Sequence, residues 1–293
     1  MITSRITLPY PGPSTPDPWA QTPEREHVVV TADALWIIVN FEHLVQVDLA
    51  SNQVTAVESL GMPVRPSVGG AGLWLYGPTD SAPISRSRLI RVDQATGALT
   101  HFPWGEPLDR MAVGRDGVWV IRSQHLYKLD PATTDELGSV PTSAWAFRAG
   151  CGELWLIDDD ADGNEAMLRI DQKTMEVVAR INAVGRPVAS ADRCWLVGDG
   201  LFQLTDETLK AVTTSPLIDA GDCFWREVGT GRIQRYDPVS ATLTGPRWQL
   251  DPDDLQPSVK GESNWLLISA GGSLWLLNRD QLIRYDISTE APG

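Results

Sequence analysis

Short apolar segments separated by polar turns recur along the whole chain, and none has the three- to four-residue spacing of an amphipathic helix. Each copy has a large aromatic residue after a small or apolar one, at Trp36, Trp74, Trp119, Trp155, Trp195, Phe224 and Trp275. A second apolar segment follows and ends in an aspartate, with a hydroxyl residue three positions later, as in Asp48 and Ser51. Only the fifth copy departs, with Thr205 in place of the aspartate. The chain is therefore a sevenfold repeat.

The length of the repeat predicts the fold. Positions equivalent to Asp48 follow one another at intervals of 32 to 49 residues, which is the size of a four-stranded propeller blade. The aromatic residue lies on the second strand, and the aspartate begins the turn from the third strand to the fourth, where its side chain can accept backbone hydrogen bonds. We expect an all-β, seven-bladed β-propeller with antiparallel blades, as a single domain over residues 1–293.

The two ends of the chain complete this prediction. After Asp286 only seven residues remain, too few for a fourth strand and its turn, whereas the strand-like segment 5–10 precedes the first blade. We expect this N-terminal segment to supply the missing strand of the last blade, which leaves few open sheet edges.

The composition of the chain limits the kinds of partner that the protein is expected to bind. The 38 acidic and 24 basic residues give a net charge of −14, which argues against nucleic acid and against an anionic membrane surface. No apolar stretch approaches the roughly 20 residues of a membrane-spanning helix, and the N-terminus lacks the apolar segment of a signal peptide. Three cysteines are an odd number and fit a reducing compartment. We expect a cytoplasmic protein without a disulfide framework.

Two repeat copies carry a family resemblance. Segments 61–74 (GMPVRPSVGGAGLW) and 105–119 (GEPLDRMAVGRDGVW) resemble the repeats of virginiamycin B lyase and, to a lesser degree, those of NHL, YVTN and lactonase-type propellers. The lyase resemblance implies a histidine, glutamates and Mg²⁺ on late blades, but the histidines here, at 27, 43, 101 and 125, precede those blades. Lactonase-type propellers imply Ca²⁺ bound where first strands begin, at positions that here hold Glu26, Val64, Asp109, Trp145, Gly185, Thr214 and Trp265. The resemblance implies the fold rather than a reaction.

Basic residues recur where the first strands begin, the region in which propellers bind ligands. The positions nine residues before each aromatic residue hold His27, Arg65, Arg110, Ala146, Arg186, Ser215 and Leu266, and Arg148 lies two residues beyond Ala146. Because side chains alternate along a strand, we expect the four arginines and His27 to face the channel. Like charges about 8 Å apart repel by roughly 2 kcal/mol at an effective dielectric of about 20. The cluster therefore needs an acceptor, either Glu26 and Asp109 or an anionic ligand.

Six tryptophans fall outside the repeat positions: Trp19, Trp104, Trp145, Trp225, Trp248 and Trp265. Trp225 directly follows Phe224, so we expect it on the opposite face of that strand. Trp104, Trp145 and Trp265 lie near the arginines, where they could contact a planar aromatic or sugar-like ligand. The alternative is that they fill gaps between blades.

Two further groups of residues bear on chemistry. Asp158, Asp160 and Asp162 match the start of a Ca²⁺ loop, although its twelfth position is Arg169, so the alternative is a solvated acidic hairpin. A divalent cation, Ca²⁺ or Mg²⁺, is accordingly a candidate cofactor. His27, Glu26 and Asp109 are the acid–base candidates, whereas we expect His125 to be a solvated residue of a short turn.

Together these features predict a protein that binds an anionic, partly aromatic small molecule at the channel mouth. The arginines would hold the ligand, and acid–base chemistry of a lyase or cyclase type could act on it. Two alternatives remain open: a scaffold whose loops bind a partner protein, and a lectin-like sugar-binding propeller.

Overall fold

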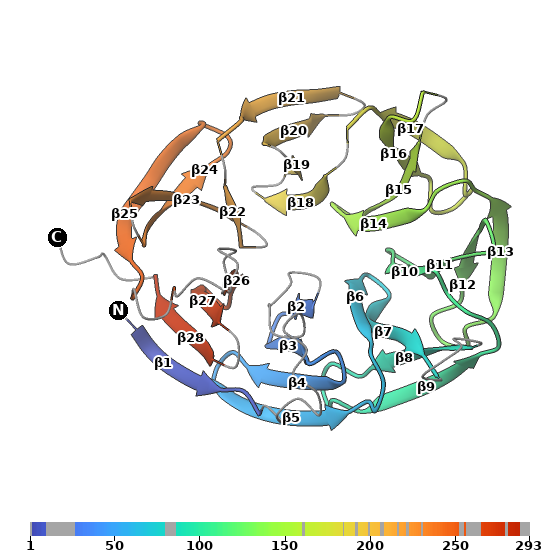
Figure 1. The fold of residues 1–293 in the computed structure, drawn as a ribbon, viewed down its shortest axis with the longest axis horizontal. Helices are drawn as coiled ribbons and strands as arrows, with labels where there is room; N and C mark the ends of the chain where they lie inside the picture. The colour runs from blue at the N-terminus through green and yellow to red at the C-terminus, as the bar shows by residue number, and fades with distance from the viewer. Residues whose placement is uncertain are drawn as a thin grey trace. The chain divides into compact units, whose positions relative to one another are not determined.

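The structure of the protein is a computed structural model. It describes residues 2–9, 27–79, 86–159, 162–183, 185–190, 193–198, 200–205, 208–215, 217–220, 223–229, 231–251, 255, 265–278 and 281–287. The chain folds into seven four-stranded sheets, numbered here as blades 1 to 7 in chain order (Figure 1). The protein is therefore an all-β, seven-bladed β-propeller, as predicted. It divides into two compact units, Met62–Ala211 and Met1–Gly61 with Val212–Gly293, and we describe each by itself.

The unit Met62–Ala211 carries blades 2 to 5. Blade 2 comprises β6 (Arg65–Gly69), β7 (Gly72–Pro78), β8 (Ser87–Val92) and β9 (Leu99–Trp104). Blade 3 comprises β10 (Arg110–Val113), β11 (Val118–Arg122), β12 (His125–Leu129) and β13 (Glu136–Pro141). Blade 4 comprises β14 (Ala146–Gly150), β15 (Glu153–Asp159), β16 (Glu165–Ile170) and β17 (Val177–Ile181). Blade 5 comprises β18 (Arg186–Ser190), β19 (Arg193–Val197), β20 (Leu201–Thr205) and β21 (Thr208–Thr213), whose end lies in the other unit.

The other unit carries blades 1, 6 and 7. Blade 1 comprises β2 (Val28–Val30), β3 (Ala34–Val39), β4 (His43–Asp48) and β5 (Gln53–Ser59). Blade 6 comprises β22 (Ile218–Asp219), β23 (Phe224–Gly229), β24 (Arg232–Asp237) and β25 (Thr242–Gln249). Blade 7 comprises β26 (Trp265–Ala270), β27 (Ser273–Asn278), β28 (Gln281–Asp286) and the N-terminal β1 (Ile2–Thr7), which pairs antiparallel with β28. The prediction that the N-terminal segment completes the last blade is confirmed.

One tryptophan anchors the second strand of every blade. Each pairs with the residue seven positions earlier on the first strand, as Trp74 does with Ser67 and Trp155 does with Arg148. These side chains are among the largest fully buried ones in the protein: Trp36, Trp74, Trp119, Trp155, Trp195, Trp225 and Trp275. Because a buried aromatic side chain removes a large apolar area from water, this position is the main packing site of each blade.

The anchor of blade 6 differs from the prediction. Trp225, rather than Phe224, pairs with Ile218 on the first strand and with Arg235 on the third. Trp275 has the corresponding partners, Ile268 and Arg284, in blade 7. The prediction of Phe224 as the anchor is therefore wrong: Trp225 lies on the opposite face of the strand from Phe224, as expected, but that face is the anchor face. Tryptophan anchors all seven blades.

The repeated aspartates cap the turns to the fourth strands, as their spacing suggested. The Asp171 carboxylate accepts hydrogen bonds from the backbone N–H groups of Thr174, at 2.8 Å, and Lys173, at 2.7 Å. The Thr174 bond is the largest cause that lowers the pKa of Asp171 below its ordinary value of 3.8. Bonds from Ser51 lower the pKa of Asp48 in the same way. These turns are held by the ionised carboxylates.

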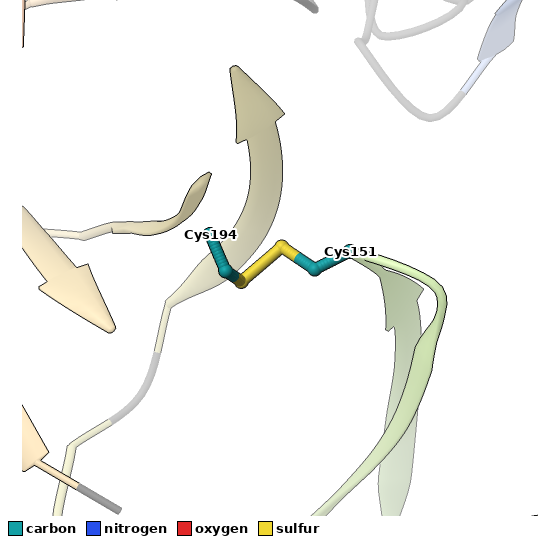
Figure 2. Close-up of a disulfide and its surroundings, with 2 residues drawn as sticks. All are labelled: Cys151 and Cys194. Carbon is teal, nitrogen blue, oxygen red and sulfur yellow. A yellow bond between two sulfur atoms is a disulfide. The ribbon is translucent and has the colours of Figure 1, made fainter. Parts of the chain in front are cut away.

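The cysteines also differ from the prediction. Cys151, in the turn between β14 and β15, forms a disulfide with Cys194 on β19, with the Cα atoms 5.6 Å apart (Figure 2). The expectation of reduced cysteines is therefore wrong for this pair, although Cys223 is a buried thiol. Because disulfides persist mainly in oxidising compartments, the cysteine content no longer supports a cytoplasmic location, which stays a prediction. Within the described residues, no helix is long and apolar enough to cross a membrane.

Candidate functional site

The first strands of blades 2 to 5 lie side by side within the unit Met62–Ala211. β10 is the neighbour of both β6 and β14, and β14 is in turn the neighbour of β18 (Figure 1). The Val113 N–H on β10 donates a hydrogen bond of 3.1 Å to Ser67 Oγ on β6. Gly150 on β14 lies so close to β18 that a Cβ there would clash with the Pro187 carbonyl. The four strands thus form a tightly packed surface.

Each of these four strands presents one arginine. Arg65, Arg110 and Arg186 are the first residues of β6, β10 and β18. In blade 4 this first position holds Ala146, and the arginine is displaced by two residues to Arg148. Because a shift of two residues keeps a side chain on the same face of a strand, the pattern of one arginine per blade is maintained.

Strand pairing gives the direction of two of these side chains. Arg148 pairs with Trp155, and Trp155 packs with Leu196 of blade 5. Arg110 pairs with Ile121, which packs with Phe147 of blade 4. Because paired residues share one face of a sheet, Arg110 emerges on the side of β14 and Arg148 on the side of β18.

Arg148 occupies an unusual position. The equivalent residues of the other six blades are small or apolar: Val29, Ser67, Ala112, Val188, Ile218 and Ile268. Arg148 is half-buried, yet it has no hydrogen-bond or ion-pair partner among the described residues. No described residue therefore supplies an acceptor for the Arg148 charge, so this position favours a ligand that supplies one.

Asp109, one of the two carboxylates expected to neutralise the arginines, does not form an ion pair with Arg110. Arg110 Nη1 donates a hydrogen bond of 3.0 Å to the backbone carbonyl of Asp109. Within the described part of the chain, the exposed Asp109 carboxylate forms no ion pair. Arg65 and Arg186 each take part in at least one further interaction. Arg110 and Arg148 thus form no ion pair with any described residue.

The three predicted ligand-binding tryptophans have different environments. Trp145 precedes β14 and is 46% exposed, which is unusual for a tryptophan. Trp104 instead packs against Arg122, whose guanidinium lies 5.8 Å from the ring centroid. Trp265 belongs to the other unit and packs against its apolar core. Trp145 alone of the three offers an open aromatic surface.

The sequence did not indicate the interactions that hold Trp104. Arg122 Nη2 donates a hydrogen bond of 2.9 Å to the Tyr127 hydroxyl and stacks 4.5 Å from that ring. Glu106 lies 3.3 Å from Arg122 Nε. These contacts with residues of blade 3 favour the alternative interpretation, in which Trp104 fills the gap between two blades.

The predicted acid–base residues do not form a described group. His27 lies in the unit that contains blade 1, where it is 7% exposed and its ring meets Phe41 edge-on with centroids 4.6 Å apart. Glu26 lies outside the described residues. Asp109 is the member of the three that lies beside the arginine-bearing strands. Their catalytic role stays a prediction.

The predicted cation site is likewise untested. Asp158 lies near the end of β15, where its Oδ2 accepts a 2.6 Å hydrogen bond from Ser143 Oγ and its Oδ1 accepts one from the Asp159 N–H at 2.9 Å. Asp160 lies outside the described residues, and Asp162 follows in the loop to β16. Among the described residues, no three His, Cys, Asp or Glu side chains come together as metal ligands would.

Comparison with known proteins extends the fold assignment. No protein-family model and no curated sequence matches the chain. Hydrazine synthase from Kuenenia stuttgartiensis aligns with a TM-score of 0.54 and 14% identity over 96% of this chain and 99% of that one. BamB from Moraxella catarrhalis aligns with a TM-score of 0.51 and 12% identity over 98% and 99%. KlHsv2 with loop 6CD replaced by a Gly-Ser linker aligns with a TM-score of 0.53 and 7% identity over 86% and 88%.

At these identities the similarity shows the fold alone, because one fold serves many functions. The class that the sheets and the comparisons define is the seven-bladed β-propeller. The likeness to virginiamycin B lyase and NHL repeats stays a resemblance of sequence.

Proposed function

We propose that the chain binds an anionic small molecule on the first strands of blades 3 to 5. Arg148 lies at the centre of the proposed site, with Arg110 on the preceding strand and Arg186 on the following one. The observation that carries the proposal is Arg148 itself, a half-buried cation without a described partner at a position that is small or apolar in every other blade. An arginine can bind a carboxylate or a phosphate through two parallel hydrogen bonds.

The ligand proposed here also contains an aromatic or other planar group. Trp145 supports this part of the proposal because its exposed ring lies on the chain segment that leads into β14. β14 packs against β10, the strand that carries Arg110. An aromatic ring stacked on Trp145 would add apolar burial to the charge interaction.

Acid–base chemistry of a lyase or cyclase type is the catalytic extension of this proposal. Asp109 could accept a proton from a ligand held by Arg110, and the arginines could stabilise the negative charge that develops. Asp109→Asn should then abolish turnover of a bound ligand while leaving its affinity within about twofold of wild type. Product analysis by mass spectrometry after incubation with each bound ligand would measure this.

The alternative function is a scaffold that binds a partner protein, and the exposed Trp145 is the observation that favours it. Exposed tryptophans are enriched where proteins bind one another. The two functions differ in their dependence on arginine, because a contact centred on Trp145 should tolerate loss of the Arg148 charge.

The experiment is a titration of the full chain, followed by tryptophan fluorescence, with benzoate, citrate, inorganic phosphate and sulfate. We expect saturable binding of at least one anion that weakens as the salt concentration rises. Arg110→Gln and Arg148→Gln should each reduce affinity by about tenfold or more, the size expected for a lost charge-assisted hydrogen bond.

Arg115→Gln is the matched control because it changes the net charge equally. Arg115 lies in the turn after β10, at the other end of that strand, and pairs with Glu153 at 3.7 Å. The Arg115→Gln variant should bind the anion with the same affinity as wild type. Absence of binding across the panel, or equal losses in all three variants, would contradict an anion site on these strands and favour the scaffold.

A further inference from the structure

A groove separates blades 3 and 4 within the unit Met62–Ala211. Its volume is about 600 Å³, which is within the range of small-molecule sites. The lining residues that matter here are His125 of blade 3 and, from blade 4, Leu156, Asp158, Leu168, Ile170 and Val177. Leu156, Leu168 and Ile170 are buried side chains at its base, and the described residues of the lining include no lysine or arginine. The groove therefore combines an apolar base with a rim on which no described residue is a lysine or an arginine.

Asp158 gives the rim a negative charge. Asp158 is a half-buried residue whose carboxylate accepts hydrogen bonds from Ser143 Oγ and the Asp159 N–H, and it has no cationic partner among the described residues. Charged groups in such partly buried places are usually paired. The Asp158 carboxylate is therefore open to a cationic ligand.

His125 adds a second acceptor to the rim. It was expected to be a solvated residue of a short turn, but it is the half-buried first residue of β12. Its Nδ1 lies 3.1 Å from the Ser123 carbonyl oxygen, and a carbonyl can only accept, so Nδ1 carries a proton. In the neutral imidazole Nε2 is then an acceptor. The two-residue turn that precedes His125 has Ser123 and Gln124 in the left-handed region, with φ of 47° and 62°, and this turn fixes the histidine at the groove.

We propose that this groove binds an organic cation, namely a primary ammonium group attached to an aliphatic chain. The ammonium group has three N–H donors and no acceptor, which matches the Asp158 carboxylate and His125 Nε2. The aliphatic chain would lie on Leu156, Leu168 and Ile170. This site is separate from the arginine-bearing strands, and its proposal does not depend on anion binding there.

The test is isothermal titration of the full chain with propyl-, butyl-, pentyl- and hexylammonium. We expect saturable binding whose affinity rises about three- to fourfold with each added methylene group, the value for burial of a CH₂. Hexanoate, which has a comparable aliphatic chain and the opposite charge, should not bind in the groove. Asp158→Asn should weaken hexylammonium binding by about tenfold.

Asp159→Asn is the matched control. It removes the same charge one residue away, but Asp159 is exposed and is not among the groove-lining residues. The Asp159→Asn variant should therefore bind hexylammonium with the affinity of wild type. Val177→Lys provides a second test that spares the internal hydrogen bonds, since Val177 is 54% exposed at the groove. The added cation should weaken binding without changing the melting temperature.

Three results would overturn the proposal. The first is absence of saturable hexylammonium binding to the wild-type protein. The second is an equal loss of affinity in Asp158→Asn and Asp159→Asn, because this would reflect net charge rather than the groove. The third is affinity that does not depend on chain length, because the apolar base would then take no part.

Discussion

At the scale of single residues, the repeated aspartates act through their ionised form. Asp48, Asp93, Asp171 and Asp237 all have a pKa below the ordinary value of 3.8, mainly because neighbouring N–H or hydroxyl groups donate hydrogen bonds to them. A lowered folded pKa means that the unfolded chain binds more protons at acid pH. The stabilisation is therefore complete above about pH 4 and is lost as the pH falls through the folded pKa.

This linkage predicts the pH dependence of an Asp171→Asn variant. At pH 7 the variant should have a lower free energy of unfolding than wild type, and the two should converge as the pH falls below about 4. Urea unfolding at a series of pH values measures the difference. Asp159→Asn is the control, since no described residue donates a hydrogen bond to that carboxylate. A difference for Asp171→Asn that stays constant down to pH 2 would contradict this account.

The sequence alone could not identify which residue anchors blade 6. The pattern of an apolar residue before an aromatic one fits both Phe224 and Trp225, which are adjacent and both buried. The repeated aspartate does not resolve this choice, because the hairpin between second and third strands varies in length between blades. Only the pairing of Trp225 with Ile218 and Arg235 fixes the register.

At the scale of strands and turns, the disulfide joins blade 4 to blade 5. Cys151 is in the left-handed region, with φ of 58°, in a two-residue turn, and Cys194 pairs with Ala189 on β18. The bond thereby links β14, which carries Arg148, to the sheet whose first strand carries Arg186. The sequence could not predict this pair, because a disulfide requires Cα atoms within about 7 Å and the approach of two blades is not visible in residue spacing.

The disulfide should contribute measurably to stability. Its cysteines are 43 residues apart, and cross-linking a loop of this length is expected to add about 2–4 kcal/mol to the free energy of unfolding. Urea unfolding with and without dithiothreitol should show a loss of this size. A Cys151→Ser/Cys194→Ser variant should be insensitive to the reductant. Identical unfolding of the wild-type protein in both conditions would contradict a role for the bond.

At the scale of the whole molecule, the repeat explains what the sequence could and could not predict. The sevenfold recurrence of anchor and aspartate predicted the number of blades, the four strands in each, and the N-terminal strand of blade 7. The arginine positions were predictable for the same reason. The environments of the predicted arginines and tryptophans were not predictable, because their burial and their partners depend on neighbouring blades. The packing of Trp104 on Arg122 is an example.

The places where one blade departs from the repeat are the ones to which we assign function. Arg148 is the clearest of these departures, since Val188 occupies the same position in the next blade. If Arg148 serves binding rather than folding, its replacement should separate the two properties. An arginine that forms no hydrogen bond or ion pair with a described residue should add nothing to stability.

The most direct test is therefore Arg148→Val, measured both for its melting temperature and for its affinity for the anion that binds wild type most tightly. We predict a melting temperature equal to or above that of wild type and an affinity at least tenfold weaker. A lower melting temperature with unchanged affinity would contradict the account, because Arg148 would then be part of the packing between blades and not of a binding site.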